Sequence, residues 1–412
     1  MTPSRWGSGG PGRVRSNGVT AAKAPTSGGE ALSVEFRAAT KRYPGADSAA
    51  VEELSLEIPA GEICVLVGPS GCGKTTAMRM ANRMVEISSG DVLIGDRSVR
   101  ERSPSQLRRE IGYVIQQIGL FPHRTIADNI ATVPRLLGWD SQDARRRSLE
   151  LLELIGLEPE LGDRYPAQLS GGQQQRVGVA RALAANPGVM LMDEPFGAVD
   201  PINRERLQNE FLRLQAELRK TILFVTHDID EAIKMGDRIA IMRVGGKLAQ
   251  YATPAELLMA PADEFVEDFV GADRALKRLA LMRVGDIDLW EAPLAHVGQA
   301  TAEVRAKLVG AEVPYALLID SERRPLGWLS EADLGRETVP ARPDTSADPM
   351  LEREDVMRDA LSDLLQAETR YAPVVDGEGR IVGVLSVEII SEFLASDEAL
   401  RDEHAAVERP LG

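Results

Sequence analysis

The feature that most constrains this chain is the glycine-rich stretch 68–76, which reads Gly-Pro-Ser-Gly-Cys-Gly-Lys-Thr-Thr. It fits the phosphate-loop pattern G-x-x-x-x-G-K-[ST]. The apolar run 63–67 before it predicts a buried parallel strand, and residues 77–81 after it predict a helix. Glycines let backbone N–H groups surround a triphosphate, and the helix start adds partial positive charge. We therefore expect Lys74 to reach the β- and γ-phosphates and Thr75 to offer its hydroxyl to Mg²⁺.

Polar side chains follow two further predicted strands. The apolar run 189–192 ends in Asp193 and Glu194, and the strand predicted at 221–226 ends in His227. An apolar run that ends in carboxylates or a histidine is typical of a buried strand whose carboxyl end reaches a phosphate site. We expect Asp193 to lie in the shell of a metal ion and Glu194 to polarise a water molecule.

A second glycine-rich turn occurs at 170–173, which reads Ser-Gly-Gly-Gln. It precedes 177–185, a stretch rich in Ala, Val and Leu that predicts a buried helix. A glycine turn at a helix N-terminus is again suited to an anion. The sequence thus predicts two anion-binding turns in one chain.

Two residues near the phosphate loop each have two interpretations. Tyr43 lies in a turn between the strands predicted at 34–39 and 51–58, where it is either a surface turn residue or a platform that stacks on a base. Cys72 lies beside Lys74 near a helix N-terminus, so it is either a thiol whose alkylation inactivates the protein or a small filler residue.

Composition limits the classes that need to be considered. The chain has 412 residues, 43% of them hydrophobic, which suggests two or three globular domains. The formal net charge of −15 argues against nucleic-acid binding, because the negatively charged phosphates bind best to a surface rich in Lys and Arg. Cys64 and Cys72 are the only cysteines, which fits a reducing compartment. An apolar run of about 18 residues, the length of a membrane span, does not occur in the sequence.

The chain also divides along its length. Residues 1–31 are rich in Gly, Ser and Pro and predict a disordered arm. The segment of about 122–168 has no strand signals and predicts a helical subdomain. In the last third, 315–330 matches 371–386 at an offset of 56 residues (371 − 315), and each copy predicts strand, turn, strand and helix.

These elements, in this order, resemble the nucleotide-binding subunit of ATP-binding-cassette (ABC) transporters over about residues 32–272. The Ser-Gly-Gly-Gln turn is the decisive feature, because a phosphate loop alone fits many nucleotide enzymes. The resemblance implies an α/β P-loop NTPase fold and a head-to-tail homodimer that sandwiches each ATP between two subunits. It rests on the phosphate loop together with Gln116, Leu169, Ser170, Gly171, Gly172, Gln173, Asp193, Glu194, Asp200 and His227.

The resemblance assigns a role to each motif. ATP is bound by the phosphate loop, with Tyr43 stacking on adenine, and by residues 169–173 of the other subunit. Asp200 makes a dimer contact, although Phe196 and its neighbours depart from the commoner Ser-Ala-Leu-Asp turn. The implied ATP-binding residues of the loop are Gly68, Pro69, Ser70, Gly71, Cys72, Gly73, Lys74, Thr75 and Thr76. The implied Mg²⁺ residues are Thr75, Gln116 and Asp193, and the implied catalytic residues are Glu194 as general base, His227, Gln116 and Lys74.

Two other segments narrow the family. The stretches 111–123 and 251–279 look like those of ATPase subunits that serve glycine betaine, choline or carnitine uptake. The internal repeat resembles a tandem α+β pair of cystathionine-β-synthase (CBS) modules, which also occur on such ATPases. The implied organisation is an ABC domain at 32–272, a linker at 273–282, CBS modules at 283–338 and 347–394, and an acidic tail at 395–412.

In the CBS family a nucleotide ribose is held by Gly, then Ser or Thr, then Asp. Gly327, Ser330 and Asp333 fit this pattern, whereas in the second copy Ser386 is followed by Ile389 where Asp is expected. An adenine or cyclic dinucleotide is thus one expected regulator. A second interpretation is regulation by salt, which would screen charge contacts of the CBS pair or of the acidic tail. In the third interpretation the CBS pair is a purely structural dimerisation module.

The resemblance implies an ATPase that drives import of a quaternary-amine osmoprotectant such as glycine betaine, choline, carnitine or proline betaine. It would sit on the cytoplasmic face of the cell membrane as a peripheral subunit. Its partners would be a second copy, a membrane permease and, through the permease, an extracytoplasmic substrate-binding protein. Two alternatives stay open: an importer ATPase for another solute such as an amino acid, and a soluble ABC ATPase outside transport.

Overall fold

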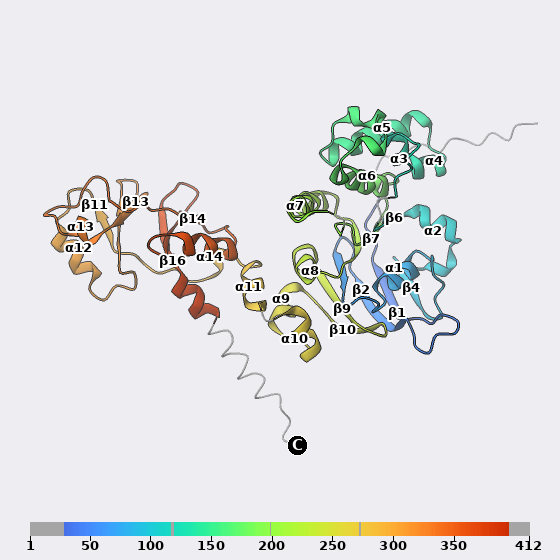
Figure 1. Ribbon diagram of the computed structural model, residues 1–412, viewed down its shortest axis with the longest axis horizontal. Helices are drawn as coiled ribbons and strands as arrows, with labels where there is room; N and C mark the ends of the chain where they lie inside the picture. The colour runs from blue at the N-terminus through green and yellow to red at the C-terminus, as the bar shows by residue number, and fades with distance from the viewer. Residues whose placement is uncertain (1–28, 117–118, 198, 272, 395–412) are drawn as a thin grey trace, which may run out of the picture. The chain divides into compact units, whose positions relative to one another are not determined.

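The computed structural model describes residues 29–116, 119–197, 199–271 and 273–394 (Figure 1). The expected arm up to residue 28 and the acidic tail 395–412 lie outside these residues. The chain divides into two compact units, residues 1–254 and 255–412. The sequence had placed the end of the first domain at 272, so the boundary lies earlier than expected.

Six strands form the central sheet of the first unit, in the order β10-β9-β3-β8-β7-β6. The five strands from β9 to β6 run parallel, and β10 is antiparallel to β9. All positions of β3, β7 and β8 are buried, which is why these strands read as continuous apolar runs. The strands are β3 (Ile63–Val67), β6 (Ile111–Val114), β7 (Val189–Asp193), β8 (Thr221–Val225), β9 (Arg238–Arg243) and β10 (Lys247–Ala252).

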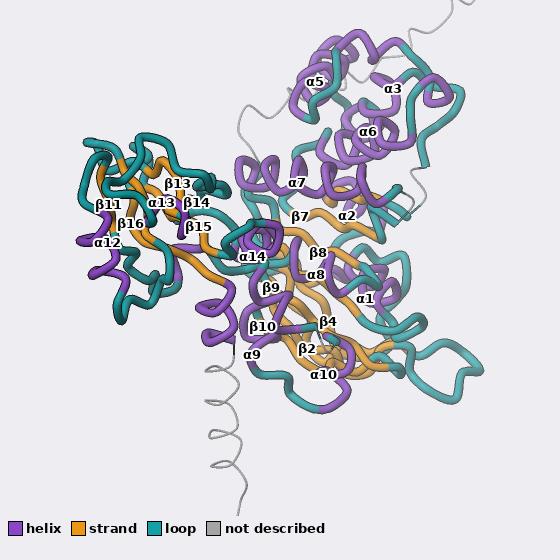
Figure 2. Tube along the Cα trace, turned by 60° about the vertical axis from the view of Figure 1, so that its left-hand side comes forward, coloured by secondary structure: helices purple, strands orange, loops and turns teal. Residues whose placement is uncertain are grey.

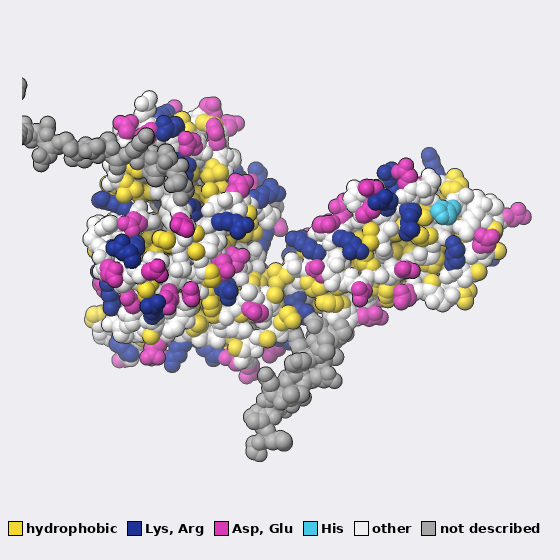
Figure 3. Space-filling view, turned by 180° about the vertical axis from the view of Figure 1, so that it is seen from behind, with side chains coloured by type: hydrophobic (Ala, Val, Ile, Leu, Met, Phe, Trp, Pro, Cys, Tyr) yellow, Lys and Arg dark blue, Asp and Glu magenta, His cyan; other side chains and the backbone are white. Residues whose placement is uncertain are grey.

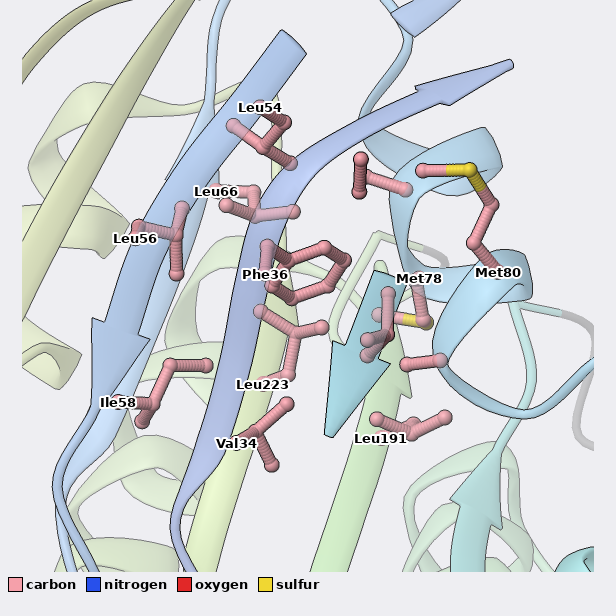
Figure 4. Close-up of a cluster of buried hydrophobic side chains, with 14 of the residues drawn as sticks. Val34, Phe36, Leu54, Leu56, Ile58, Leu66, Met78, Met80, Leu191 and Leu223 are labelled. Carbon is pink, nitrogen blue, oxygen red and sulfur yellow. The ribbon is translucent and has the colours of Figure 1, made fainter. Parts of the chain in front are cut away.

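A second, antiparallel sheet has the order β2-β1-β4-β5. Its strands are β1 (Val34–Lys41), β2 (Val51–Ile58), β4 (Ser89–Ile94) and β5 (Arg97–Ser98). Its apolar side chains share one core with the central sheet. Figure 4 shows Phe36 of β1 in this core, with Leu54 and Leu56 of β2 on one side and Met78 on the other. Met78 belongs to α1 (Lys74–Ala81), so the core directly supports the helix that follows the phosphate loop.

The predicted helical subdomain is confirmed. Residues 122–168, all of which the structure describes, contain α3 (Ile126–Ile130), α4 (Thr132–Leu136), α5 (Ser141–Leu154) and two short 3-10 turns at Pro159–Asp163 and Pro166–Gln168. The side chains of Thr125 and Asp140 cap α3 and α5 by accepting backbone N–H bonds. These helices group with α6 (Gly171–Leu183), as Figures 1 and 2 both show.

The other helices of the first unit connect its strands. They are α2 (Pro104–Glu110), α7 (Pro201–Leu218) and α8 (Ile229–Met235). The α7 helix begins at the cap Asp200 and ends at Arg219, whose φ of 46° is left-handed. This backbone conformation ends the helix and turns the chain into β8.

The second unit starts with three short helices, α9 (Pro254–Met259), α10 (Glu264–Val270) and α11 (Arg274–Leu279). The expected linker 273–282 is therefore mostly helical. Leu279 is fully buried and packs in one core cluster with Val284 and Leu351. Because Leu279 packs in this core, α11 belongs with the second unit, and the bounds of the individual domains stay predictions.

Two three-stranded sheets, β11-β12-β13 and β14-β15-β16, confirm the internal repeat. In each sheet the first pair is parallel and the second antiparallel. The register also repeats at the same offset, since Leu317 faces Trp328 and Pro373 faces Val384. The elements are β11 (Leu294–His296), α12 (Thr301–Leu308), β12 (Ala316–Ile319), β13 (Pro325–Leu329), α13 (Glu331–Leu334), β14 (Leu351–Glu352), α14 (Met357–Gln366), β15 (Tyr371–Val375) and β16 (Ile381–Ser386).

Charged side chains of both signs are interspersed over the face shown in Figure 3. Among the described helices, none combines the length and the apolar composition that crossing a membrane requires.

Candidate active site

The phosphate loop joins β3 to α1 and needs glycine at two crowded positions. The backbone φ is +151° at Gly68 and +102° at Gly73. A Cβ atom at Gly73 would lie 2.2 Å from the carbonyl oxygen of Ala50, and one at Gly68 would lie 2.3 Å from that of Met242. Both the left-handed backbone and the close approach of other carbonyls exclude a side chain. The loop is thus fixed from two sides.

Lys74 lies at the first turn of α1 and is only 7% exposed. Its Nζ donates hydrogen bonds to the carbonyl oxygens of Gly68, at 2.7 Å, and Pro69, at 3.0 Å. The ammonium therefore lies within the curve of the loop, where it adds a full positive charge to the N–H groups that line it.

Cys72 also lies in the loop, but its side chain is fully buried in the hydrophobic core. Its Sγ is 3.7 Å from Lys74 Nζ. The proximity to Lys74 was expected, whereas the burial favours the filler interpretation over an accessible, alkylatable thiol.

Thr75 and Asp193 meet at the edge of the loop. Thr75 Oγ1 donates to Asp193 Oδ1 at 3.1 Å, and Asp193 is 5% exposed at the end of β7. Burial raises the pKa of Asp193, partly opposed by the Thr75 hydrogen bond and by Arg79. Within the described residues, no group of three or more His, Cys, Asp or Glu side chains is placed to hold a metal ion. One carboxylate and one hydroxyl beside a phosphate loop nevertheless fit Mg²⁺, which takes most of its ligands from water and phosphates.

Two predicted catalytic residues, Gln116 and His227, contact the carboxylate of a third, Glu194. Gln116 Nε2 donates to Glu194 Oε2 at 2.8 Å, and His227 Nδ1 lies 3.2 Å from Glu194 Oε1. These residues follow β6, β7 and β8, three neighbouring parallel strands whose carboxyl ends share one edge of the sheet. The side chain of His227 is 60% exposed and that of Glu194 22% exposed, so the group is open to solvent.

Glu194 has an unusual backbone. Its φ is 45°, in the left-handed region that non-glycine residues rarely adopt. Its N–H donates to Val225 O of β8 at 2.9 Å, and its carbonyl accepts from Gly197 N at 3.2 Å. Such a conformation persists only where the surrounding structure holds it, and it occurs most often at functional sites.

The Ser-Gly-Gly-Gln turn forms the N-terminus of α6. Ser170 Oγ accepts from the backbone N–H of Gln173, and Gln173 Oε1 accepts from Ser170 N at 2.9 Å, which completes a capping box. Leu169 precedes the cap and is buried, whereas Ser170 and Gly171 are exposed. This turn lies with the helical subdomain rather than beside α1 (Figures 1 and 2). The structure does not bring the two predicted anion-binding turns of one chain together.

The other candidates are surface residues. Tyr43 is 41% exposed in the turn after β1, where Lys41 Nζ lies 5.0 Å from its ring centroid. Asp200 caps α7 by accepting from the N–H of Asn203 at 3.1 Å. Neither position tests the predicted role, so stacking on adenine and the dimer contact stay predictions.

In the first CBS copy, Asp333 is fully buried in a capping box with Ser330. Asp333 Oδ2 also accepts from the backbone N–H of Asp344 at 3.2 Å. At Gly327, φ is +150° and a Cβ atom would lie 2.4 Å from Pro343 Cγ. These contacts explain the Gly-Ser-Asp pattern without a ligand, and the ribose site stays a prediction. In the second copy Ile389 is buried in the core, as its apolar side chain requires.

Sequence reasoning missed two residues of α6 that contact the site. Gln175 Nε2 donates to the carbonyl oxygen of Pro195, directly after Glu194. Arg181 Nη1 donates to Gly119 O at 2.5 Å, three positions after Gln116. Gln175 is 4% exposed, but it lies in the polar run 173–176, so the sequence offered no signal that singles it out.

Two family models match this chain. One is described as ABC transporter and matches residues 51–197, and the other is described as CBS domain and matches residues 345–396. The chain is 46% identical over 361 residues to the osmoprotectant import ATP-binding protein OsmV of Salmonella typhimurium, covering 85% of this chain and 93% of that protein. It is 43% identical over 373 residues to the choline transport ATP-binding protein OpuBA of Bacillus subtilis, covering 87% and 96%.

Among solved structures, CbiO1 from Clostridium perfringens, described as part of the ABC transporter complex CbiONQ, has a TM-score of 0.52 and 25% identity. The match covers 60% of this chain and 94% of that chain. It supports the cassette fold of the first unit.

Proposed function

Because the chain belongs to the ATP-binding subunits of ABC-type osmoprotectant importers, we propose that the ATPase drives uptake of a quaternary amine such as glycine betaine, choline or carnitine. Relatives named for osmoprotectant, choline and carnitine transport cover most of this chain, which supports that cargo class. The ATPase itself does not contact the cargo, so the proposal for the substrate rests on these relatives.

The observation that carries the catalytic proposal is the position of the Glu194 carboxylate between Gln116 and His227. In this proposal Glu194 accepts a proton from a water molecule whose oxygen attacks the γ-phosphorus, and the bond to the oxygen of the ADP leaving group breaks. Lys74 and the loop N–H groups offset the charge on the transferred phosphoryl group, and His227 contacts it. Gln116 orients the water.

Thr75 and Asp193 would hold Mg²⁺. Gln116, which is hydrogen-bonded to Glu194, would contact both the ion and the attacking water. Bound there, the ion would neutralise phosphate charge.

A head-to-tail homodimer is the assembly that fits best. Within one chain, α6, whose N-terminus carries the exposed Ser170 turn, groups with the helical subdomain and not with α1, which follows the phosphate loop (Figures 1 and 2). Two helix N-termini can clamp one γ-phosphate from both sides only if the second comes from another copy. ATP binding would then close the dimer and hydrolysis would reopen it, which is a two-state motion that a membrane permease can use.

The remaining partners follow from the transport role. We place the subunit on the cytoplasmic face of the membrane, docked on a permease that receives cargo from an extracytoplasmic binding protein. The second unit would regulate transport, either through salt-screened charge contacts or through an adenine or cyclic dinucleotide near Asp333. Segment 343–345 lies against both Gly327 and Asp333, so it would border a nucleotide bound there.

The cargo is tested by ATP-dependent uptake in vesicles that contain the complete complex. Glycine betaine, choline, carnitine and proline would be compared at equal concentration, with the Glu194→Gln complex as the inactive control. Uptake of a quaternary amine by the wild type alone supports the proposal. Transport of proline with no quaternary amine transported would identify an importer for another solute.

A further inference from the structure

The loop that carries Glu194 is held from three directions. β8 accepts a hydrogen bond from the N–H of Glu194, and Gly197 donates one to its carbonyl. The third bond comes from Gln175 of α6, whose amide donates to the carbonyl oxygen of Pro195. Of the three, only the Gln175 bond links this loop to the helix that begins with the Ser-Gly-Gly-Gln turn.

The conformation that these bonds hold is unfavourable by itself. Glu194 has a φ of 45°, in the left-handed region that is unfavourable for a residue with a side chain. The following residue is Pro195, whose ring restricts the backbone of the residue before it mainly to extended conformations. Without external support, the peptide at Glu194 would relax, and the carboxylate would turn away from Gln116 and His227.

Gln175 is well placed to supply that support. Its side chain is 4% exposed, so its amide has no solvent to compete for the N–H, and a buried carbonyl without a partner is costly. The same helix donates a second hydrogen bond, from Arg181 to Gly119, in the segment that follows Gln116. The α6 helix therefore contacts the segments on both sides of the Gln116–Glu194 hydrogen bond.

We infer that Gln175 is a positioning residue for Glu194. By holding the carbonyl of Pro195, it keeps the left-handed backbone that aims the carboxylate at the attacking water. Because Gln175 lies two residues after the Ser170–Gln173 turn, a shift of α6 on contact with nucleotide at that turn also moves the support of Glu194 in the same chain. This inference rests on the proposed role of Glu194 as general base.

The experiment uses the full-length protein and measures kcat and KM for ATP. Gln175→Met keeps the length of the side chain and removes the donor, and Gln175→Glu replaces the donor by an acceptor. We expect both variants to lose about tenfold in kcat with KM for ATP within about twofold of wild type, because ground-state binding does not use this bond. Nucleotide binding to each purified variant, measured directly, confirms that the remaining protein is folded.

The matched control is Gln208→Met. Gln208 is also a buried glutamine, 6% exposed, and donates to Glu231 Oε1 at 3.0 Å rather than to the segment that carries Glu194. This variant should lose stability without a change in kcat. If Gln175→Met behaves like Gln208→Met, with lower stability and an unchanged kcat, Gln175 has a structural role alone and the inference is overturned.

A double-mutant cycle separates this inference from the proposal for Glu194. In the Glu194→Gln background, Gln175→Met should cause no further loss of the residual turnover, since the group it positions is gone. Additive losses would show that Gln175 acts elsewhere. A Glu194→Gln variant with normal turnover would instead remove the proposed general base, whatever the effect of Gln175→Met.

Discussion

At the scale of single residues, Glu194 is expected to act only in turnover. Glu194→Gln keeps the size of the side chain and its hydrogen bond with Gln116, but it removes the base. We predict that ATP still binds and that kcat falls by about a hundredfold or more, the usual contribution of a positioned general base. ATP should then hold a stable dimer, which light scattering with and without Mg²⁺ and ATP would detect. Turnover close to wild type would exclude Glu194 from the mechanism.

Substitution of Lys74 should lower the affinity for ATP, whereas substitution of Glu194 should lower turnover. Lys74→Ala removes the ammonium that lies against Gly68 and Pro69 inside the loop. The affinity for ATP should fall by roughly 10- to 100-fold, since a charge-assisted hydrogen bond to phosphate is worth about 1.5–3 kcal/mol. A fluorescent nucleotide titration measures it, and unchanged affinity would show that Lys74 does not contact the phosphates.

The same scale shows where sequence reasoning succeeds and where it stops. Gln116, Glu194 and His227 could be expected together because each follows a strand of the predicted sheet. Gln175 and Arg181 act through backbone carbonyls of distant loops, and nothing in the local sequence says which carbonyl lies opposite. The burial of Cys72 was also open, because a loop sequence does not say which side chain faces the core.

At the scale of helices and strands, the apolar strands were predictable because both faces of the central sheet are buried. The helical nature of 273–282 was not expected. Asp273 and Lys277 form an ion pair of 3.0 Å across one turn, and Leu279 anchors the helix in the core. Ala, Leu, Lys and Arg in this segment favour a helix, and this local signal was available in the sequence.

One helix carries a buried carboxylate whose charge should cost stability. Glu231 of α8 is 7% exposed, and burial raises its pKa above the ordinary 4.5, although hydrogen bonds from Thr226 and Gln208 oppose the shift. A raised carboxyl pKa means that the folded state prefers the protonated form. The contribution of Glu231 to the free energy of unfolding is thus fully present below the ordinary pKa and is lost as the pH rises through the raised one.

Glu231→Gln replaces the charged group by a neutral amide that can still accept from Gln208. We predict a Tm higher by a few degrees at pH 7.5, with the difference vanishing as the pH falls below about 4.5. Thermal unfolding of both proteins across a pH series measures it. A variant less stable than wild type at neutral pH would contradict the assigned cost of the charge.

At the scale of the whole molecule, the second unit is expected to act on transport rather than on the chemistry of ATP. If charge contacts of this unit hold transport off at low salt, raising ionic strength should release it, because the Debye length shrinks to about 8 Å near physiological strength. Transport by the reconstituted complex across a salt series tests this. The truncated control should end after residue 254, where the first unit ends, since a cut at 280 would leave Leu279 without its core. Equal salt activation in the truncated complex would show that the sensor lies elsewhere.

The capping box at Ser170 has a consequence for the direction of one proton. A serine hydroxyl has one hydrogen to give and two lone pairs to receive. One lone pair of Ser170 already takes the N–H of Gln173, while the residue faces solvent. Its hydrogen is free to donate outward, and an incoming phosphate oxygen can accept it. The cap therefore leaves this hydroxyl able to act as a donor to an anion at the same time as it holds the start of α6.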